Sequence, residues 1–338
     1  MIEMAKRADK PKVLATFHSP LLSEDMMKKL SEVAVVQFAS EEAPTEQDVI
    51  TGIGDADVLL VTSRRPTISG RIIQAGKRLK AVVVPSVGFD QIDVEAATEL
   101  GVLVVNTPSA DDVVAEQTIL LMLAVAKQFP RLVEAAKEGV RVPTWKENVE
   151  LFGKTLGIIG LGRIGSRVAQ IANAMGMSVI AYDPFVSERH ARLLKTRLVD
   201  LKTLLRESDF VSIHTPLTKE TYHIIGEGEL NLMKKTAFII NTARGKCIDE
   251  KALYVALRER RIAGAGLDVF EVEPLRPDNP LLALDNVVAT AHSLSGSIER
   301  TQRIQQMVLD SILRTLRGAL PRHIVNPQVL DAVIGGQG

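Results

Sequence analysis

Short runs of apolar residues recur along the chain, separated by amphipathic segments of helical length. In the first part of the chain, five of these runs are continuous and β-branched, at residues 13–17, 33–36, 58–61, 81–84 and 102–105. Continuous apolar runs of this length are typical of strands buried on both faces of a parallel sheet. The segments between them, such as 23–30 and 69–78, predict covering helices. This part of the chain is therefore predicted to be a doubly wound α/β unit.

A long helical stretch is predicted next, over residues 111–138, and its portion at 118–126 is apolar on nearly all sides. A helix of this kind must be covered by other protein, either between domains or at a dimer interface. A second series of six strands follows at 154–159, 178–182, 210–213, 237–240, 263–267 and 287–290, and a final helix is predicted over 298–316. Six strands are the number in a complete dinucleotide-binding sheet. A βα series that starts afresh in mid-chain predicts two α/β domains with a cleft between them.

A glycine-rich turn, GLGRIG at residues 160–165, follows the first strand of the second series and opens a helix. Gly160 allows the tight turn, Gly162 lets the backbone approach a pyrophosphate, and Gly165 lets the helix lie close to the sheet. The helix N-terminus offers N–H groups and partial positive charge to the phosphates. The next strand ends at Asp183, whose carboxylate would accept hydrogen bonds from ribose hydroxyls and repel a 2′-phosphate. This arrangement predicts an NAD site and favours NAD over NADP.

The composition narrows the class of protein. The chain has 338 residues, which suggests about two domains, and 46% of them are hydrophobic, enough for sizeable cores. Acidic and basic residues balance at 41 each, so we expect neither nucleic acid nor a membrane as a partner. Cys247 is the only cysteine, which excludes an internal disulfide and fits a reducing compartment. The N-terminus lacks the apolar core of a signal peptide, and no apolar run approaches the ~18 residues of a membrane span, so we expect a cytoplasmic protein.

Three segments place polar residues directly after predicted strands, where ligands bind in open α/β sheets. Arg244 follows one strand, and its planar guanidinium matches a carboxylate, although it suits a surface turn equally well. The segment DVFEVEP at 268–274 brings three carboxylates, which fit either a partner for a histidine or a solvated acidic loop. His292 ends the sixth strand, where a histidine is often structural, but its charge changes nearest neutral pH. Together they supply the proton donor, the cation and the tuning acid that reduction of a ketone by NADH needs.

With these segments in this order, the sequence resembles the D-isomer-specific 2-hydroxyacid dehydrogenases over nearly the whole chain. The resemblance is densest over residues 107–292. It is closest to the phosphoglycerate dehydrogenase branch, in KTLGIIGLGRIG at 154–165 and HTPLT at 214–218. The order of the glycine turn, NTARG, DVFEVEP and TAH is specific to this family.

The resemblance implies an α/β fold of two doubly wound parallel-sheet domains. One is a flavodoxin-like substrate-binding domain, discontinuous in the chain, of residues 1–107 and 293–338. The other is an inserted Rossmann NAD-binding domain of residues 108–292. Because the chain ends at Gly338, we expect a short form without the C-terminal regulatory domain of the long phosphoglycerate dehydrogenases.

The resemblance also implies roles for individual residues. Arg244 would bind the substrate carboxylate and keto oxygen, and Glu273 would pair with His292, which would protonate the carbonyl oxygen. The residues expected to bind NAD are Gly160, Gly162, Arg163, Ile164, Gly165, Asp183, His214, Thr215, Pro216, Thr242, Ala243 and Asp268. The residues expected to bind substrate are Ser86, Val87 and Gly88, through backbone N–H groups, with Arg64 and Arg65 as either phosphate contacts or a solvated pair. No metal is expected.

We therefore expect an NAD-dependent D-2-hydroxyacid dehydrogenase, with 3-phosphoglycerate as a candidate substrate. A glyoxylate or hydroxypyruvate reductase would use the same residues on a smaller substrate. An NAD(H)-sensing regulatory protein of the same fold is a third alternative, disfavoured by the compact length. Ala291 before the histidine and Leu294 two residues after it depart from the family pattern, and Leu294 is expected to narrow or redirect the substrate pocket. The expected partners are a small 2-keto or 2-hydroxy acid and a second copy of the chain in a homodimer.

Overall fold

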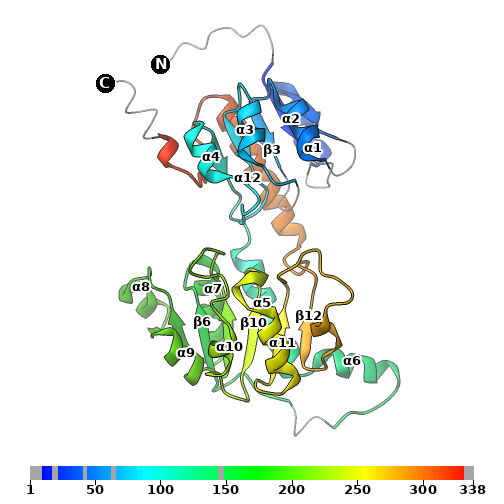
Figure 1. The fold of residues 1–338 in the computed structure, drawn as a ribbon, viewed down its shortest axis with the longest axis vertical. Coiled ribbons are helices and arrows are strands. Elements are labelled where there is room, and N and C mark those ends of the chain that lie inside the picture. Colours follow the sequence, from blue (N-terminus) through cyan, green and yellow to red (C-terminus); the bar gives the residue numbers. More distant parts are fainter. Residues whose placement is uncertain (1–9, 17–21, 41–43, 62–65, 144–147, 331–338) are drawn as a thin grey trace. The chain divides into compact units, whose positions relative to one another are not determined.

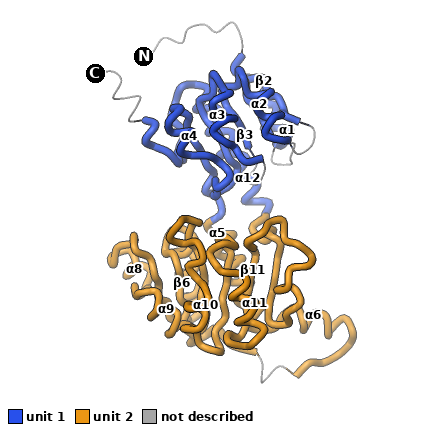
Figure 2. Tube along the Cα trace, in the orientation of Figure 1, with its two compact units in different colours: residues 1–110, 297–338 blue, residues 111–296 orange. Residues whose placement is uncertain are grey.

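The structure of the chain is a computed structural model with two compact units. It describes residues 10–16, 22–40, 44–61, 66–143 and 148–330. Unit 1 comprises residues 1–110 and 297–338, and unit 2 comprises residues 111–296 (Figure 2). Each division coincides with the start of a helix, α5 at Asp111 and α12 at Ile298 after its N-cap Ser297. The candidate substrate contacts Arg64 and Arg65 lie outside the described residues.

Unit 1 alternates strands and helices along the chain. Its elements are β1 (Lys12–Ala15), α1 (Glu24–Val33), β2 (Val35–Phe38), α2 (Glu46–Ile53), β3 (Val58–Leu60), α3 (Gly70–Ala75), β4 (Ala81–Val83), α4 (Val94–Glu99), β5 (Leu103–Val105) and α12 (Ile298–Leu316). In the described part of this unit, five parallel strands follow the flavodoxin-like order β2-β1-β3-β4-β5. The predicted doubly wound unit is confirmed. The second strand begins later than predicted because Val33 still belongs to α1.

Helices cover both faces of this sheet. On one face, side chains of α2 and α3 such as Ile53 and Ile72 join the core. On the other face, α1 is joined by α12, which contributes Ile304, Val308 and Ile312 at helical spacing. Full burial of such an aliphatic side chain stabilises a fold by about 1.5–3 kcal/mol. The C-terminal helix is therefore part of the core of unit 1.

Unit 2 is built around the second strand series (Figure 1). Its elements are α5 (Asp111–Ala126), α6 (Phe129–Lys137), β6 (Thr155–Ile159), α7 (Arg163–Ala174), β7 (Ser178–Tyr182), α8 (Glu188–Leu193), β8 (Thr196–Leu198), α9 (Leu201–Glu207), β9 (Phe210–Ile213), α10 (Glu227–Leu230), β10 (Phe238–Asn241), η1 (Gly245–Cys247), α11 (Glu250–Arg258), β11 (Gly264–Leu267), η2 (Pro280–Ala283) and β12 (Val287–Ala289). Helices α9, α10 and α11 pack on one face of the sheet, and α5, α7 and α8 pack on the other. The unit is thus doubly wound as well.

The sheet of unit 2 has seven parallel strands among the described residues, so the prediction of six is wrong. The order is β12-β11-β10-β9-β6-β7-β8. The missed strand, β8, is short and has the sequence Thr196-Arg197-Leu198. It pairs with β7 alone at the sheet edge, and an edge strand needs no continuous apolar run. The strands β8-β7-β6-β9-β10-β11 form the six-stranded Rossmann order, and β12 extends it.

The predicted helical stretch at 111–138 is two helices. Gln128, with a left-handed φ of 50°, separates α5 from α6, and Pro130 lies in the first turn of α6, where its missing N–H costs no hydrogen bond. Most of α5 is buried within unit 2, so its apolar character does not by itself require another domain or subunit. Leu120 and Leu123 of α5 remain exposed. In the described ranges, every helix is too short or too polar to cross a membrane.

Candidate active site

The turn between β6 and α7 contains three glycines with different requirements. Gly160 has a left-handed φ of 92°, and a Cβ there would lie 2.9 Å from Cγ2 of Thr215. A Cβ on Gly165 would overlap the carbonyl oxygen of Gly160, so only glycine lets α7 lie this close to β6. Gly162 has an ordinary φ of −72°, and a Cβ there would meet no described atom within 4 Å. Because neither backbone nor packing requires glycine at 162, its position before the N-terminus of α7 fits close approach of a phosphate ligand.

Asp183, directly after β7, supports this turn. The backbone N–H of Leu161 donates to Oδ2 at 2.8 Å, and the backbone N–H of Phe185 donates to Oδ1 at 2.9 Å. These two bonds orient the carboxylate beside the turn. A carboxylate has about four acceptor sites, so it can also accept hydrogen bonds from ribose hydroxyls.

The side chain of Arg163 is engaged within the protein. Its Nε and Nη2 atoms donate to Oδ2 of Asp111 at 2.8 and 2.5 Å, which joins the start of α7 to the start of α5. Ile164 is partly buried. What these two residues can offer a dinucleotide is the backbone N–H groups of the first helical turn.

His214, Thr215 and Pro216 follow β9 and form a wall of the glycine turn. A Cβ on Gly160 would touch both the Thr215 methyl and the His214 backbone. Nε2 of His214 lies 2.8 Å from Oγ of Ser212, and burial of the imidazole lowers the pKa of His214 to about 3. His214 is therefore neutral at physiological pH and brings no charge to the phosphate side of the site.

The turn that carries Arg244 is pressed against the segment that carries the acidic residues. A Cβ on Gly245 would overlap the backbone of Phe270, so the two segments touch through their main chains. Nδ2 of Asn241 donates to the carbonyl of Arg244 at 2.9 Å, and Nη1 of Arg244 donates to the carbonyl of Ala243 at 2.7 Å. The neighbouring Thr242 hydroxyl lies 3.0 Å from the Thr118 hydroxyl of α5.

Asp268, directly after β11, joins its own segment to the segment after β12 and to helix α5. Its side chain is buried, and the carboxylate accepts hydrogen bonds from Oγ1 of Thr290 at 2.6 Å, from the backbone N–H of Ser293 at 3.1 Å and from Nε2 of Gln117. Its backbone carbonyl accepts from the N–H of His292 at 2.7 Å. Asp268 thus holds the backbone on both sides of His292, which has a left-handed φ of 53°.

Glu273 and His292 meet side chain to side chain. Nδ1 of His292 lies 2.7 Å from Oε2 of Glu273, and Oε1 of Glu273 accepts from the N–H of Phe270 at 3.3 Å. With Nδ1 directed to the carboxylate, Nε2 is the ring nitrogen suited to exchange a proton with a substrate. The carboxylate also stabilises an imidazolium, so the pair can act as a general acid–base.

Gln117, Thr290 and Ser293 are supporting residues that the sequence prediction did not include. Gln117 had a detectable signal, because it begins the mostly apolar part of α5, where a buried polar side chain needs a hydrogen-bond partner.

Leu294 and Ala291, the two residues that depart from the family pattern, have different surroundings. The Leu294 side chain packs on the apolar core that includes residues of α5, α7 and β6, whereas Ala291 is exposed.

The predicted substrate loop, Ser86 to Gly88, lies in unit 1 after β4. Oγ of Ser86 donates to the carbonyl of Gly88 at 2.6 Å, and Nδ2 of Asn106 donates to the carbonyl of Val87 at 2.8 Å. The N–H of Thr107 donates to the carbonyl of Ser86 at 3.0 Å. These bonds hold the loop to the segment that follows β5.

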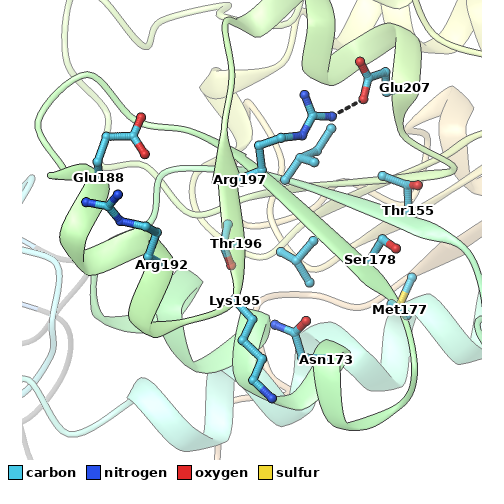
Figure 3. A pocket seen from close by; sticks show the side chains of 12 residues that line it. Thr155, Asn173, Met177, Ser178, Glu188, Arg192, Lys195, Thr196, Arg197 and Glu207 are labelled. Atoms are coloured by element: carbon cyan, nitrogen blue, oxygen red, sulfur yellow. Dashed lines mark hydrogen bonds and ion pairs between the residues drawn. The ribbon is translucent and has the colours of Figure 1, made fainter.

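A hollow of about 720 Å³ lies at the amino ends of strands β6, β7 and β8 in unit 2 (Figure 3). It is lined by the first residues of three parallel strands, Thr155, Ser178 and Thr196, together with cations such as Arg192. The glycine turn and the Glu273–His292 pair follow the opposite, carboxyl ends of strands. The hollow is therefore not part of the candidate active site.

The chain is similar to known proteins over most of its length. Residues 119–293 match the family model of the NAD-binding domain of D-isomer specific 2-hydroxyacid dehydrogenases. The chain is 45% identical over 317 residues to a D-3-phosphoglycerate dehydrogenase of Methanocaldococcus jannaschii, an alignment that covers 93% of this chain and 60% of that protein. It is 41% identical over 327 residues to a glyoxylate reductase of Korarchaeum cryptofilum, covering 95% of this chain and 97% of that one.

The structure is also similar to solved structures. One is D-lactate dehydrogenase from Aquifex aeolicus complexed with NAD and lactic acid, with a TM-score of 0.83 and 30% sequence identity. That likeness covers 93% of this chain and 99% of the other.

Proposed function

The chain belongs to the D-isomer specific 2-hydroxyacid dehydrogenase family, and on this premise we propose that it transfers hydride between NAD(H) and a 2-keto or 2-hydroxy acid. The observation that carries the proposal is the hydrogen-bonded Glu273–His292 pair, 2.7 Å apart, on the sheet whose glycine turn fits a dinucleotide. NADH, when bound, supplies the hydride. The residues of the chain supply the proton and hold the substrate.

In this mechanism His292 gives a proton from Nε2 to the carbonyl oxygen of the substrate, and Glu273 holds Nδ1–H and stabilises the imidazolium. Arg244 binds the substrate carboxylate with its planar guanidinium and polarises the keto group. In the oxidation direction, His292 takes the hydroxyl proton. General acid–base catalysis of this kind typically contributes about 10²–10⁴-fold to the rate.

We assign the substrate to the discontinuous part of the chain, residues 1–107 and 293–338, with the backbone N–H groups of Ser86 to Gly88 as carboxylate donors. We assign NAD to residues 108–292. The loop from Ser86 to Gly88 is held by hydrogen bonds of 2.6 and 2.8 Å, and this fixed conformation supports a preformed anion site in unit 1.

Two substrate classes have similar support. A phosphorylated three-carbon keto acid is favoured by identity to the phosphoglycerate dehydrogenase, although the chain spans only 60% of that protein. Glyoxylate or hydroxypyruvate is favoured by a relative that matches over 97% of its length. The two differ in one requirement, because a phosphate needs additional cations in the substrate pocket.

The decisive experiment follows NADH oxidation with phosphohydroxypyruvate, hydroxypyruvate, glyoxylate and pyruvate. We expect turnover of at least one, and the ranking of kcat/KM identifies the substrate class. NADH binding without turnover of any of them would overturn the enzyme proposal and favour a regulatory NAD(H) sensor.

We also propose that the chain forms a homodimer through α5 and α6. Leu120 and Leu123 of α5 are 50% and 36% exposed, and Phe129 at the start of α6 is 56% exposed. No described residue of α6 is buried in the single chain, although this helix has an apolar side. Contiguous exposed apolar side chains mark association surfaces. Light scattering of the wild type should give a dimer mass and Leu120→Glu a monomer; a monomeric wild type would overturn this proposal.

A further inference from the structure

A second histidine–glutamate pair adjoins the active-site segment and has no part in the mechanism above. Nε2 of His223 lies 2.7 Å from Oε1 of Glu271, which precedes Glu273 by only one intervening residue. The two side chains are 27% and 29% exposed. His223 has a left-handed φ of 49°, and its backbone N–H donates to the carbonyl of Lys246 at 2.9 Å. The pair therefore joins the loop after β9 to the segment after β11, beside the turn that follows Arg244.

Glu250, the first residue of α11, completes this cluster. Its backbone N–H donates to Oε1 of Glu271 at 3.1 Å, and its own Oε2 accepts from the backbone N–H of Glu271 at 3.0 Å. Nδ2 of Asn279 donates to Oε1 of Glu250 at 2.7 Å. A helix N-terminus stabilises carboxylates, so two glutamates can lie this close together here. Glu271 is held both through its side chain and through its main chain.

The position of Glu273 depends on this segment. Glu273 accepts from the N–H of Phe270, and the backbone of Phe270 and Glu271 is in contact with Gly245, next to Arg244. The short segment from Phe270 to Glu273 is thus bound at one point to His223 and Glu250 and at another to His292. A rotation of this segment would move the Glu273 carboxylate away from Nδ1 of His292.

We propose that His223, Glu250 and Glu271 form a positioning clamp that fixes the Glu273 carboxylate against His292. The clamp acts through Glu273 and makes no contact with the reacting atoms; its effect on turnover rests on the proposed function, whereas its effect on geometry does not.

The kinetic test is a double-mutant cycle on Glu271 and Glu273. Glu271→Ala should lower kcat about tenfold, because small displacements of catalytic groups are costly, while KM for NADH changes less than about twofold. In a Glu273→Ala background, adding Glu271→Ala should change kcat less than about twofold. Glu271→Gln should recover most of the activity, because its amide oxygen still accepts from His223 and from the Glu250 N–H. Equal losses from Glu271→Ala in both backgrounds would overturn the clamp.

Glu207→Ala is the matched control. It removes a carboxylate paired with Arg197 in the same unit, near the opposite edge of the sheet, and should leave kcat unchanged. If Glu271→Ala does not fold, His223→Ala removes one arm of the clamp and leaves the Glu250 N–H in place. It takes the place of Glu271→Ala in the cycle.

A structural test separates the clamp from the proposed reaction. Crystal structures of the wild type and Glu271→Ala, or His223→Ala in its place, measure the distance from Oε2 of Glu273 to Nδ1 of His292. We expect the hydrogen bond in the wild type and its loss in the variant. An intact bond in the variant would overturn the clamp, whether or not any keto acid is turned over. Loss of the bond in a protein that turns over none of the keto acids would support the clamp and overturn the reaction alone.

Discussion

Nδ1 of His292 lies 2.7 Å from Oε2 of Glu273, and the backbone on both sides of that histidine is bound to Asp268. The ring therefore has a set orientation, although the residue adopts a left-handed φ that non-glycine residues rarely take. Residues held in sparsely populated backbone conformations by their surroundings cluster at active sites. In His292, this backbone conformation directs Nδ1 to the Glu273 carboxylate and leaves Nε2 on the side of the ring away from it.

Replacement of this histidine tests the proton transfer. We expect His292→Ala to lower kcat by at least ~10², with NADH affinity nearly unchanged, because the variant loses the general acid and keeps the glycine turn. His190→Ala removes an exposed histidine of α8 and should leave kcat unchanged. Near-normal turnover by His292→Ala would show that the proton comes from another group.

The glycines of the turn should respond differently to alanine. Gly165→Ala should destabilise the protein by roughly 1–3 kcal/mol, because its Cβ overlaps the Gly160 carbonyl. Gly162→Ala should cost no more than about 1 kcal/mol, the scale of an N-cap change, because its Cβ meets no described atom. It should nevertheless weaken NADH binding at least about tenfold, equivalent to about 1.4 kcal/mol. Urea unfolding and NADH fluorescence titration measure the two effects; wild-type affinity in Gly162→Ala would contradict the assigned phosphate position.

Cofactor selectivity should depend on the charge of Asp183. Asp183→Asn keeps an amide oxygen for the N–H of Leu161 but removes the charge that repels a 2′-phosphate. The ratio of NADPH to NADH affinity should rise at least about tenfold. Asp200→Asn, at the N-cap of α9, is the matched control and should leave the ratio unchanged. An unchanged ratio in Asp183→Asn would show that selectivity has another source.

Stability should depend on pH through His214. Burial lowers the pKa of this imidazole to about 3 from an ordinary value of 6.5, so in acid the unfolded chain takes up a proton that the folded chain does not. The free energy of unfolding should therefore fall as pH drops below 6.5, by at most about 1.4 kcal/mol per pH unit from this group. Urea unfolding between about pH 5 and about pH 7 measures the slope, and His214→Asn should reduce it. An equal slope in the variant would show that the imidazole titrates normally in the fold.

Local patterns in the sequence were enough to predict most of the architecture. Continuous apolar runs predicted the buried strands β3, β4, β6 and β9, because a strand covered on both faces is apolar at most of its positions. The final helix was predicted over its observed range, Ile298–Leu316. The edge strand β8 could not be found in this way, because one of its edges and part of its surface face solvent.

Residue order alone determined that three carboxylates, Asp268, Glu271 and Glu273, lie close in one segment, and a resemblance singled out Glu273. The tertiary structure decided their partners: Asp268 binds the segment around His292, Glu271 binds His223 and Glu250, and Glu273 binds the His292 ring. The partners come from segments far apart in the chain. The strand order β12-β11-β10-β9 brings these segments together at the carboxyl ends of the strands. A hydrogen bond forms only at a specific distance and angle, and these are set by the packing of whole elements rather than by any local pattern.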